Sequence, residues 1–203
     1  MEYIDLSHKL INNLEVFPGD PEFKLNNFKV PDENDSSLIS KISACLHSGT
    51  HIDSPLHYIK NTNNILNLKL DNLIGKSSII QYKNNEKEIH IEKFENPLEK
   101  IVILNTTWCN NWGSDKYFIE NPYLSKEFAE TLIEKNINGL AIDTPSVDKF
   151  GKSTIHKILL KNNIWIVENL TNTNRIVKNK YYAYFIPINI DAEASFVRAF
   201  LKK

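Results

Sequence analysis

The chain has 203 residues, of which 41% are hydrophobic, and it carries 24 basic against 25 acidic side chains. A chain of this length favours one domain, so we expect residues 1–203 to fold as a single unit. The formal net charge of −1 argues against nucleic-acid binding through a broad basic face, and the 10% aromatic content argues against intrinsic disorder.

Membrane and export signals are missing from the sequence pattern. No run approaches the ~18 apolar residues that a membrane helix needs, and the start Met1–Leu6 lacks the basic and apolar regions of a signal peptide. The two cysteines, Cys45 and Cys109, are too few for a disulfide framework. We therefore expect a reduced, cytoplasmic protein that has no membrane partner.

Strand-like runs outnumber helical ones along the chain. A helix is expected from a cap at Ser125 to about Lys135, and a shorter one from Ser153 or Thr154 to Leu160. Several strands are too short and polar for an all-parallel sheet, which favours a mixed α/β domain whose sheet is partly closed, with helices outside. The expected strands are Tyr3–Leu6, Ile39–Leu46, Ser77–Tyr82, Ile101–Asn105, Gly139–Ile142, Ile164–Val167 and Tyr181–Ile190.

The segment His47–His57 concentrates three of the six histidines of the chain and one aspartate in eleven positions. A roughly helical turn after His47 would place His47 and His51 on one face, and Asp53 would add an oxygen to the same centre. Two imidazoles and a carboxylate suit Zn²⁺ or Mn²⁺ and leave a coordination position for water. Structural histidines are the alternative, but the HxxxHxDxxxH spacing at the end of an expected strand favours a metal site.

The same segment reads HxGTHxDxPxH and in this resembles the hallmark of the cyclase-like metal-dependent hydrolases, which include bacterial kynurenine formamidases and isatin hydrolases. The resemblance implies a swivelling β/β/α fold with a barrel-like core, and assembly as a homodimer or homotetramer. Weaker matching blocks extend it over nearly the whole chain: Ile4–His8, Phe17–Asp20, Ile142–Asp148, His156 with Glu168, and Asp191 with Val197–Ala199.

Roles for individual residues follow from that resemblance. It implies one or two Zn²⁺ ions, with Mn²⁺ as the alternative, and two bridging carboxylates that offset the charge of a second cation. Taken alone, His156 reads as a packed or exposed helix residue and Glu168 as the solvent-facing end of a strand. The implied ligands are His47, His51, Asp53, His156 and Glu168, and the implied proton donor and acceptor is His57.

These assignments make chemical sense together. A divalent cation lowers the pKa of a bound water from 15.7 toward ~7, so hydroxide becomes available to attack an amide or formamide carbonyl. An imidazole with an ordinary pKa of about 6.5 can take that proton and return it to the departing nitrogen. His57 lies beyond Pro55 and outside the implied ligand set, which leaves it free for this work.

Three further segments have two interpretations each. By the resemblance Phe17 lines the substrate pocket, and alternatively it packs the core before a Pro-Gly turn. Asp143–Asp148 follows an expected strand, where active-site loops commonly begin. Alternatively, its polar residues merely cap turns. Tyr181–Ile190 is either a contact between subunits or a central core strand.

The sequence thus predicts a metal-dependent hydrolase that cleaves the carbon–nitrogen bond of a small-molecule amide. N-formylkynurenine is the leading substrate by resemblance, and a cyclic lactam such as isatin is the alternative. A metal-binding protein of the same fold without turnover is the rival from another class. Nucleotide binding is disfavoured because the chain has no glycine-rich phosphate loop.

Overall fold

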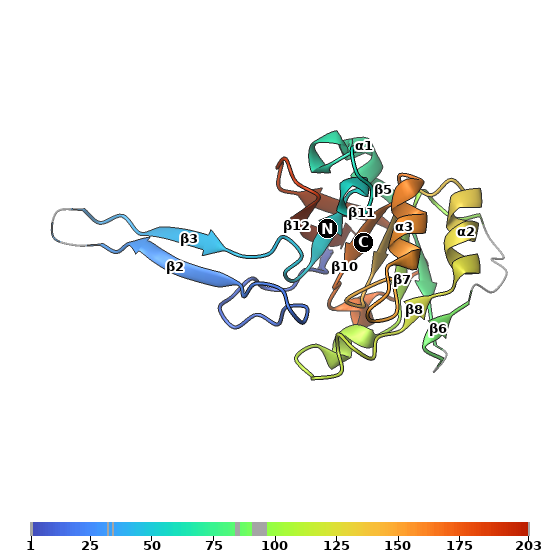
Figure 1. Ribbon diagram of the computed structural model, residues 1–203, viewed down its shortest axis with the longest axis horizontal. Coiled ribbons are helices and arrows are strands. Elements are labelled where there is room, and N and C mark those ends of the chain that lie inside the picture. The colour runs from blue at the N-terminus through green and yellow to red at the C-terminus, as the bar shows by residue number, and fades with distance from the viewer. Residues whose placement is uncertain (1, 32, 34, 84–85, 91–96, 203) are drawn as a thin grey trace.

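The computed structural model describes residues 2–31, 33, 35–83, 86–90 and 97–202 of the chain. Within these residues, seven strands pair in the order β12-β11-β5-β7-β9-β10-β4, and β4 pairs back with β12, so the sheet closes into a barrel (Figure 1). Strand β1 (Tyr3–Asp5) extends the sheet from the free edge of β12. The barrel strands are β4 (His51–Asp53), β5 (Ile74–Gln81), β7 (Ile101–Asn105), β9 (Gly139–Ile142), β10 (Trp165–Glu168), β11 (Lys180–Pro187) and β12 (Ala194–Lys202).

The sheet is mixed, as the sequence predicted. Strands β5, β7, β9 and β10 run parallel, whereas β4, β11 and β12 join it antiparallel. The predicted strands Ile101–Asn105 and Gly139–Ile142 coincide with β7 and β9. The prediction for Ile164–Val167 is shifted by one residue, because the strand continues to Glu168. The segment Tyr181–Ile190 corresponds to β11, which lies between β5 and β12 and is thus a central strand, one of its two interpretations.

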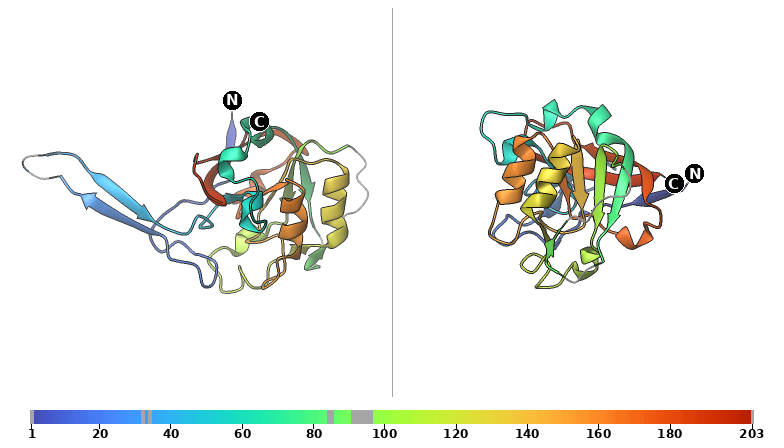
Figure 2. Two further views of the ribbon diagram at one scale, coloured as in Figure 1. Left: turned by 45° about the horizontal axis from the view of Figure 1, so that its top comes forward. Right: turned by 90° about the vertical axis from the view of Figure 1, so that its right-hand side faces the viewer.

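Two helices cover the outer face of the parallel strands. Helices α2 (Lys126–Glu134) and α3 (Thr154–Lys161) lie side by side there, as Figures 1 and 2 show. Along β7, Val102 faces these helices while Ile103 faces the barrel interior, so each strand serves two apolar cores. The Ser125 hydroxyl accepts the Phe128 N–H at 3.1 Å and begins α2 as predicted.

The remaining elements are short. None of the helices in the described ranges combines the length and hydropathy that a bilayer crossing requires. These remaining elements are helix α1 (Leu70–Leu73), the paired strands β6 (Glu88–Ile89) and β8 (Tyr123–Leu124), and the 3-10 turns η1 (Pro55–His57), η2 (Ile65–Asn67), η3 (Trp108–Asn111) and η4 (Thr173–Arg175).

The expected strand Ile39–Leu46 does not belong to the barrel. It forms β3 (Ile39–Ser43), which pairs with β2 (Lys24–Lys29) in a hairpin arm that projects away from the barrel (Figures 1 and 2). Every residue of β3 is exposed, Ile42 to 53%. The alternating pattern predicted this strand correctly, and the chain passes from it into the motif. Its place in an exposed arm was not predicted.

His8 supports a prediction about pH. Its ring stacks on Trp112 at 3.7 Å between centroids, its Nε2 is buried, and burial lowers its pKa from 6.5 to about 4. Between those values the unfolded chain binds the extra proton, so stability falls as the pH drops from 6.5 toward 4. We expect His8 to cost about 1–2 kcal/mol of stability at pH 5 relative to pH 7.5.

The His8→Phe variant tests this, because it keeps an aromatic ring on Trp112 but cannot titrate. Urea unfolding at the two pH values should show a smaller acid-induced loss in the variant than in the wild type. Equal losses would mean that His8 keeps its ordinary pKa.

Candidate metal centre and active site

The motif reaches the barrel through a tight turn. His47 lies in this turn and His51 begins β4, so the predicted helical turn between them is wrong. Gly49 has a φ of +62°, and a Cβ there would lie 3.1 Å from the Leu10 side chain. The left-handed backbone and the close approach both favour glycine. The turn still brings the two imidazoles together, with ring centroids 4.9 Å apart.

Strand β4 places two donors on one face. His51 and Asp53 point outward, while Ile52 between them packs in the barrel core. Strand β10 adds a third donor, since Glu168 is paired in register with His51. The His51 Nε2 atom lies 3.5 Å from Glu168 Oε2 and 3.7 Å from Asp53 Oδ1.

Helix α3 contributes His156 to the same face. Its Nε2 lies 3.1 Å from Glu168 Oε1 and 3.6 Å from Asp53 Oδ2. Asp148 orients this residue: its carboxylate accepts the backbone N–H groups of Ile155 and His156 and contacts the ring Nδ1 at 2.7 Å. The expected cap residue Ser153 makes no side-chain cap, so Asp148 both begins the helix and aims the histidine.

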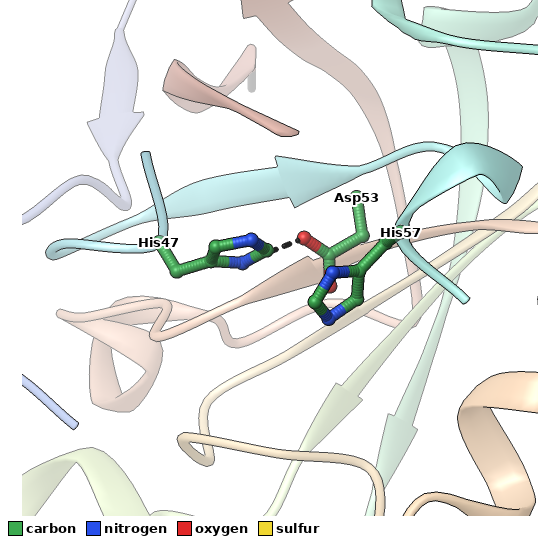
Figure 3. Close-up of side chains that lie close together, drawn as sticks. All are labelled: His47, Asp53 and His57. Carbon is green, nitrogen blue, oxygen red and sulfur yellow. Dashed lines mark ion pairs between the residues drawn. The ribbon is translucent and has the colours of Figure 1, made fainter. Parts of the chain in front are cut away.

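His47 and His57 also approach Asp53, and Figure 3 shows the three side chains converging. The His47 Nδ1 atom lies 3.1 Å from Asp53 Oδ1. The rings of His47 and His57 have centroids 4.3 Å apart. Glu193, which the sequence interpretation did not single out, lies 3.4 Å from His47 Nε2 through its Oε1.

The potential ligands form two groups that share Asp53. One comprises His47, Asp53 and His57, the other His51, Asp53 and Glu168, with ligand atoms within 4.8 Å of one another in each. Donors on one tetrahedral zinc at about 2.1 Å lie roughly 3.4 Å apart, close to the separations found here. Within the described residues, His51 Nε2 and both Asp53 oxygens are buried without a hydrogen bond, which fits a bound cation.

The electrostatics also fit a cation. Burial lowers the pKa of His47, but Asp53, Glu168 and Glu193 outweigh it and raise this pKa to about 9. Burial likewise opposes a charged His156, yet Glu168, Asp148 and Asp53 hold its pKa well above the ordinary value. For His57 burial prevails and lowers the pKa. The carboxylates therefore stabilise positive charge at the centre of the site.

A chain of hydrogen bonds fixes His51 from behind. Its Nδ1 lies 3.0 Å from the Gly49 carbonyl, so Nε2 faces the carboxylates. The Asn169 side chain donates to that same carbonyl at 2.9 Å, and Tyr117 donates its hydroxyl to Asn169 Oδ1 at 3.0 Å. Such partners orient a histidine ligand and fix its tautomer.

A cavity of about 250 Å³ opens above the donor groups. Phe17 lines it, stacked on Phe150 at 5.6 Å and edge-on to Phe118 at 5.9 Å between centroids. The structure thus brings together all six polar residues that the sequence singled out and puts Phe17 beside them. Asp20, from the matching block Phe17–Asp20, also lines the cavity, as do Tyr58, Lys149 and Lys152, which no sequence signal identified.

Comparisons with known proteins agree with this architecture. The Cyclase family model matches residues 4–149. A kynurenine formamidase of Bacillus thuringiensis subsp. konkukian is 31% identical over 99% of this chain and 97% of its own, and an uncharacterised protein of Methanocaldococcus jannaschii is 34% identical over 98% and 97%.

Solved structures share the fold. Isatin hydrolase A from Labrenzia aggregata superposes with a TM-score of 0.84 at 19% identity, covering 98% of this chain and 93% of that one. A predicted metal-dependent hydrolase from Bacillus stearothermophilus gives 0.82 at 20% identity, covering 98% and 97%. The resemblance read from the His47–His57 motif is confirmed, and the chain belongs to the Cyclase family of metal-dependent hydrolases.

Proposed function

We propose that the protein is a metal-dependent hydrolase that cleaves the carbon–nitrogen bond of aromatic formamides, as the name of its formamidase relatives indicates for them. One observation carries the proposal: two donor groups that share a buried carboxylate lie at the base of an aromatic-lined cavity. This arrangement can hold divalent cations beside an aromatic amide and keep most of the bulk water away.

We propose Zn²⁺ as the metal, with Mn²⁺ as the alternative, because imidazole and carboxylate ligands accept both. One or two ions would be held by His47, His51, Asp53, His156 and Glu168. When bound, the metal polarises the carbonyl and makes water more acidic.

The side chains around the metal ligands supply binding and proton transfer. Phe17 and Phe150 offer ring faces to an aromatic substrate. His57 lines the cavity beside His47, where it can take a proton at a ring nitrogen and deliver it to the leaving amine. Asp148 holds the ring of His156 in place.

A metal-loaded hydrolysis assay tests the proposal. The purified protein is analysed for metal and then assayed with formanilide, N-formylkynurenine and isatin, before and after treatment with a chelator. We expect chelator-sensitive hydrolysis of the formamides. Activity on isatin alone would favour the lactam alternative, and a loaded site with no turnover of any of the three would favour a metal-binding protein without catalysis.

We also propose that the chain is a homodimer in which the β2–β3 arm packs on a second copy. A two-stranded hairpin is marginally stable alone, yet this one exposes Phe28 to 74% and Ile42 to 53%. A two-fold contact would cover both arms at once.

The molar mass from light scattering of the protein as it elutes from a size-exclusion column tests the arm contact. The Phe28→Asp/Ile42→Asp double variant should be a monomer, whereas Val177→Asp, at an equally exposed site outside the arm, should remain a dimer. A monomeric wild type would overturn the proposal, and a dimer that survives the arm substitutions would place the contact elsewhere.

A reducing, cytoplasmic location is the last part of the proposal. Cys45 and Cys109 are both free thiols, and Cys109 is buried. Cell fractionation tests the location, and recovery of the protein outside the cytoplasm would contradict it.

A further inference from the structure

One tight turn at the cavity rim combines an aromatic ring with two cations. The Lys152 N–H donates to the Lys149 carbonyl at 2.9 Å, and Gly151 inside the turn has a φ of +76°. Residues at the two ends of such a turn have Cα atoms within about 7 Å of each other. The turn, which lies between β9 and α3, therefore brings both lysines to the same part of the rim as Phe150.

Neither lysine is neutralised by a carboxylate among the residues that the structure describes. Within the described part of the chain, Lys149 and Lys152 form no ion pair, although several other lysines do. Asp20 lines the same cavity, but its carboxylate accepts the thiol of Cys45 at 3.6 Å instead of binding a lysine. Two unpaired ammonium groups on flexible stems are thus available to an anion at the rim.

The cavity limits what such an anion can belong to. Its volume of about 250 Å³ lies below the ~300–1,000 Å³ typical of pockets for drug-sized ligands, so a single aromatic ring with short substituents fits best. Among the lining residues, three ligand candidates are buried, namely His51, His156 and Glu168. Lys149–Lys152 are exposed, so we place the candidates at the base and the turn at the rim. A substrate ring packed against Phe17 and Phe150 can direct one substituent to the base of the cavity and another to the rim.

We propose that Lys149 and Lys152 select substrates in which the aromatic ring of the formamide also bears a carboxylate. This inference rests on the proposed function and adds its specificity. The carboxylate binds at the rim while the formyl group meets the metal centre. The net gain of about one charged hydrogen bond between exposed lysines and the carboxylate corresponds to a preference of about 10–100-fold in kcat/KM over a neutral formanilide.

The test compares formanilide with the three ring isomers of formamidobenzoate. The variants are Lys149→Met, Lys152→Met and the double variant, and Lys161→Met at the exposed end of α3 serves as the matched control. For at least one isomer, kcat/KM should exceed that of formanilide in the wild type but not in the double variant, mainly because KM rises. Metal content and formanilide turnover should be unchanged. Lys161→Met should behave as the wild type.

The outcomes separate the two claims. Equal kcat/KM for neutral and anionic substrates in the wild type, or equal losses on both in the double variant, would overturn the role of the lysines and leave the formamidase proposal intact. If the metal-loaded wild type hydrolyses no formamide, the proposed function fails. Isothermal calorimetry then decides the role of the lysines by comparing the affinity for aminobenzoates with the affinity for aniline. The role is supported only if the wild type binds the aminobenzoates more tightly than aniline and the double variant does not.

Discussion

Replacing Asp53 by Asn is expected to empty the metal centre and to lower turnover by at least about 10⁴-fold, since bound metal supplies the reactive water. Asp53 belongs to both donor groups, and its side chain is fully buried. β4 is held between β10 and β12, which fixes the position of Asp53 in the site. The amide keeps the shape of the side chain but loses the negative charge that a divalent cation needs.

Elemental analysis and calorimetric titration with Zn²⁺ provide the measurement. Glu193→Gln is the matched control, because Glu193 contacts His47 but lies outside both donor groups, and we expect it to keep the wild-type stoichiometry. Circular dichroism should show the same fold for both variants. Full metal occupancy in Asp53→Asn would refute a shared carboxylate, and loss of only part of the metal would limit Asp53 to one position.

Short-range patterns predicted much of the barrel. Strand β7 was predicted with its correct bounds because four apolar residues, three of them β-branched, precede polar Asn105 and Thr106. Helix α2 was predicted because Ser125 is followed by apolar residues at helical spacing. These signals lie within single segments. The tertiary structure changed them by no more than a residue or two.

Segments defined by distant contacts were harder to predict. Strand β12 was not expected, although its buried and exposed positions alternate, and it closes the barrel by pairing with β4 about 140 residues away in sequence. At β3 the strand was predicted, but the exposure of all its residues in the arm was not. An alternating pattern shows that one face is apolar, but it does not show what covers that face.

The candidate site divides in the same way. The ligand candidates in His47–Asp53 could be proposed because they are close in sequence, although the route of the chain between them was wrong. Asp148 belongs to the segment Asp143–Asp148, which was expected to be an active-site loop or to cap turns, but its contact with His156 was not foreseen. Asn169 gave no signal, and each of these two residues acts on a histidine that only the fold brings near. The lysines of the rim turn gave none either, because isolated lysines are usually solvated.

The His57→Ala variant is expected to lower kcat by about 10²–10⁴-fold, the usual contribution of a positioned acid or base. His57 is the last residue of η1 and lines the cavity, so its ring would face a substrate bound there. Because His57 forms a donor group with His47 and Asp53, it could instead serve as a metal ligand. Activity alone cannot separate these two roles.

Metal content and chemical rescue separate them. A proton-transfer role predicts full metal content in His57→Ala and partial recovery of turnover when imidazole is added to the assay. Tyr58→Phe is the control, because Tyr58 packs against His57 at 4.3 Å between ring centroids and can lose its hydroxyl without loss of the ring. Loss of metal together with turnover would make His57 a ligand. Proton transfer would then fall to another group.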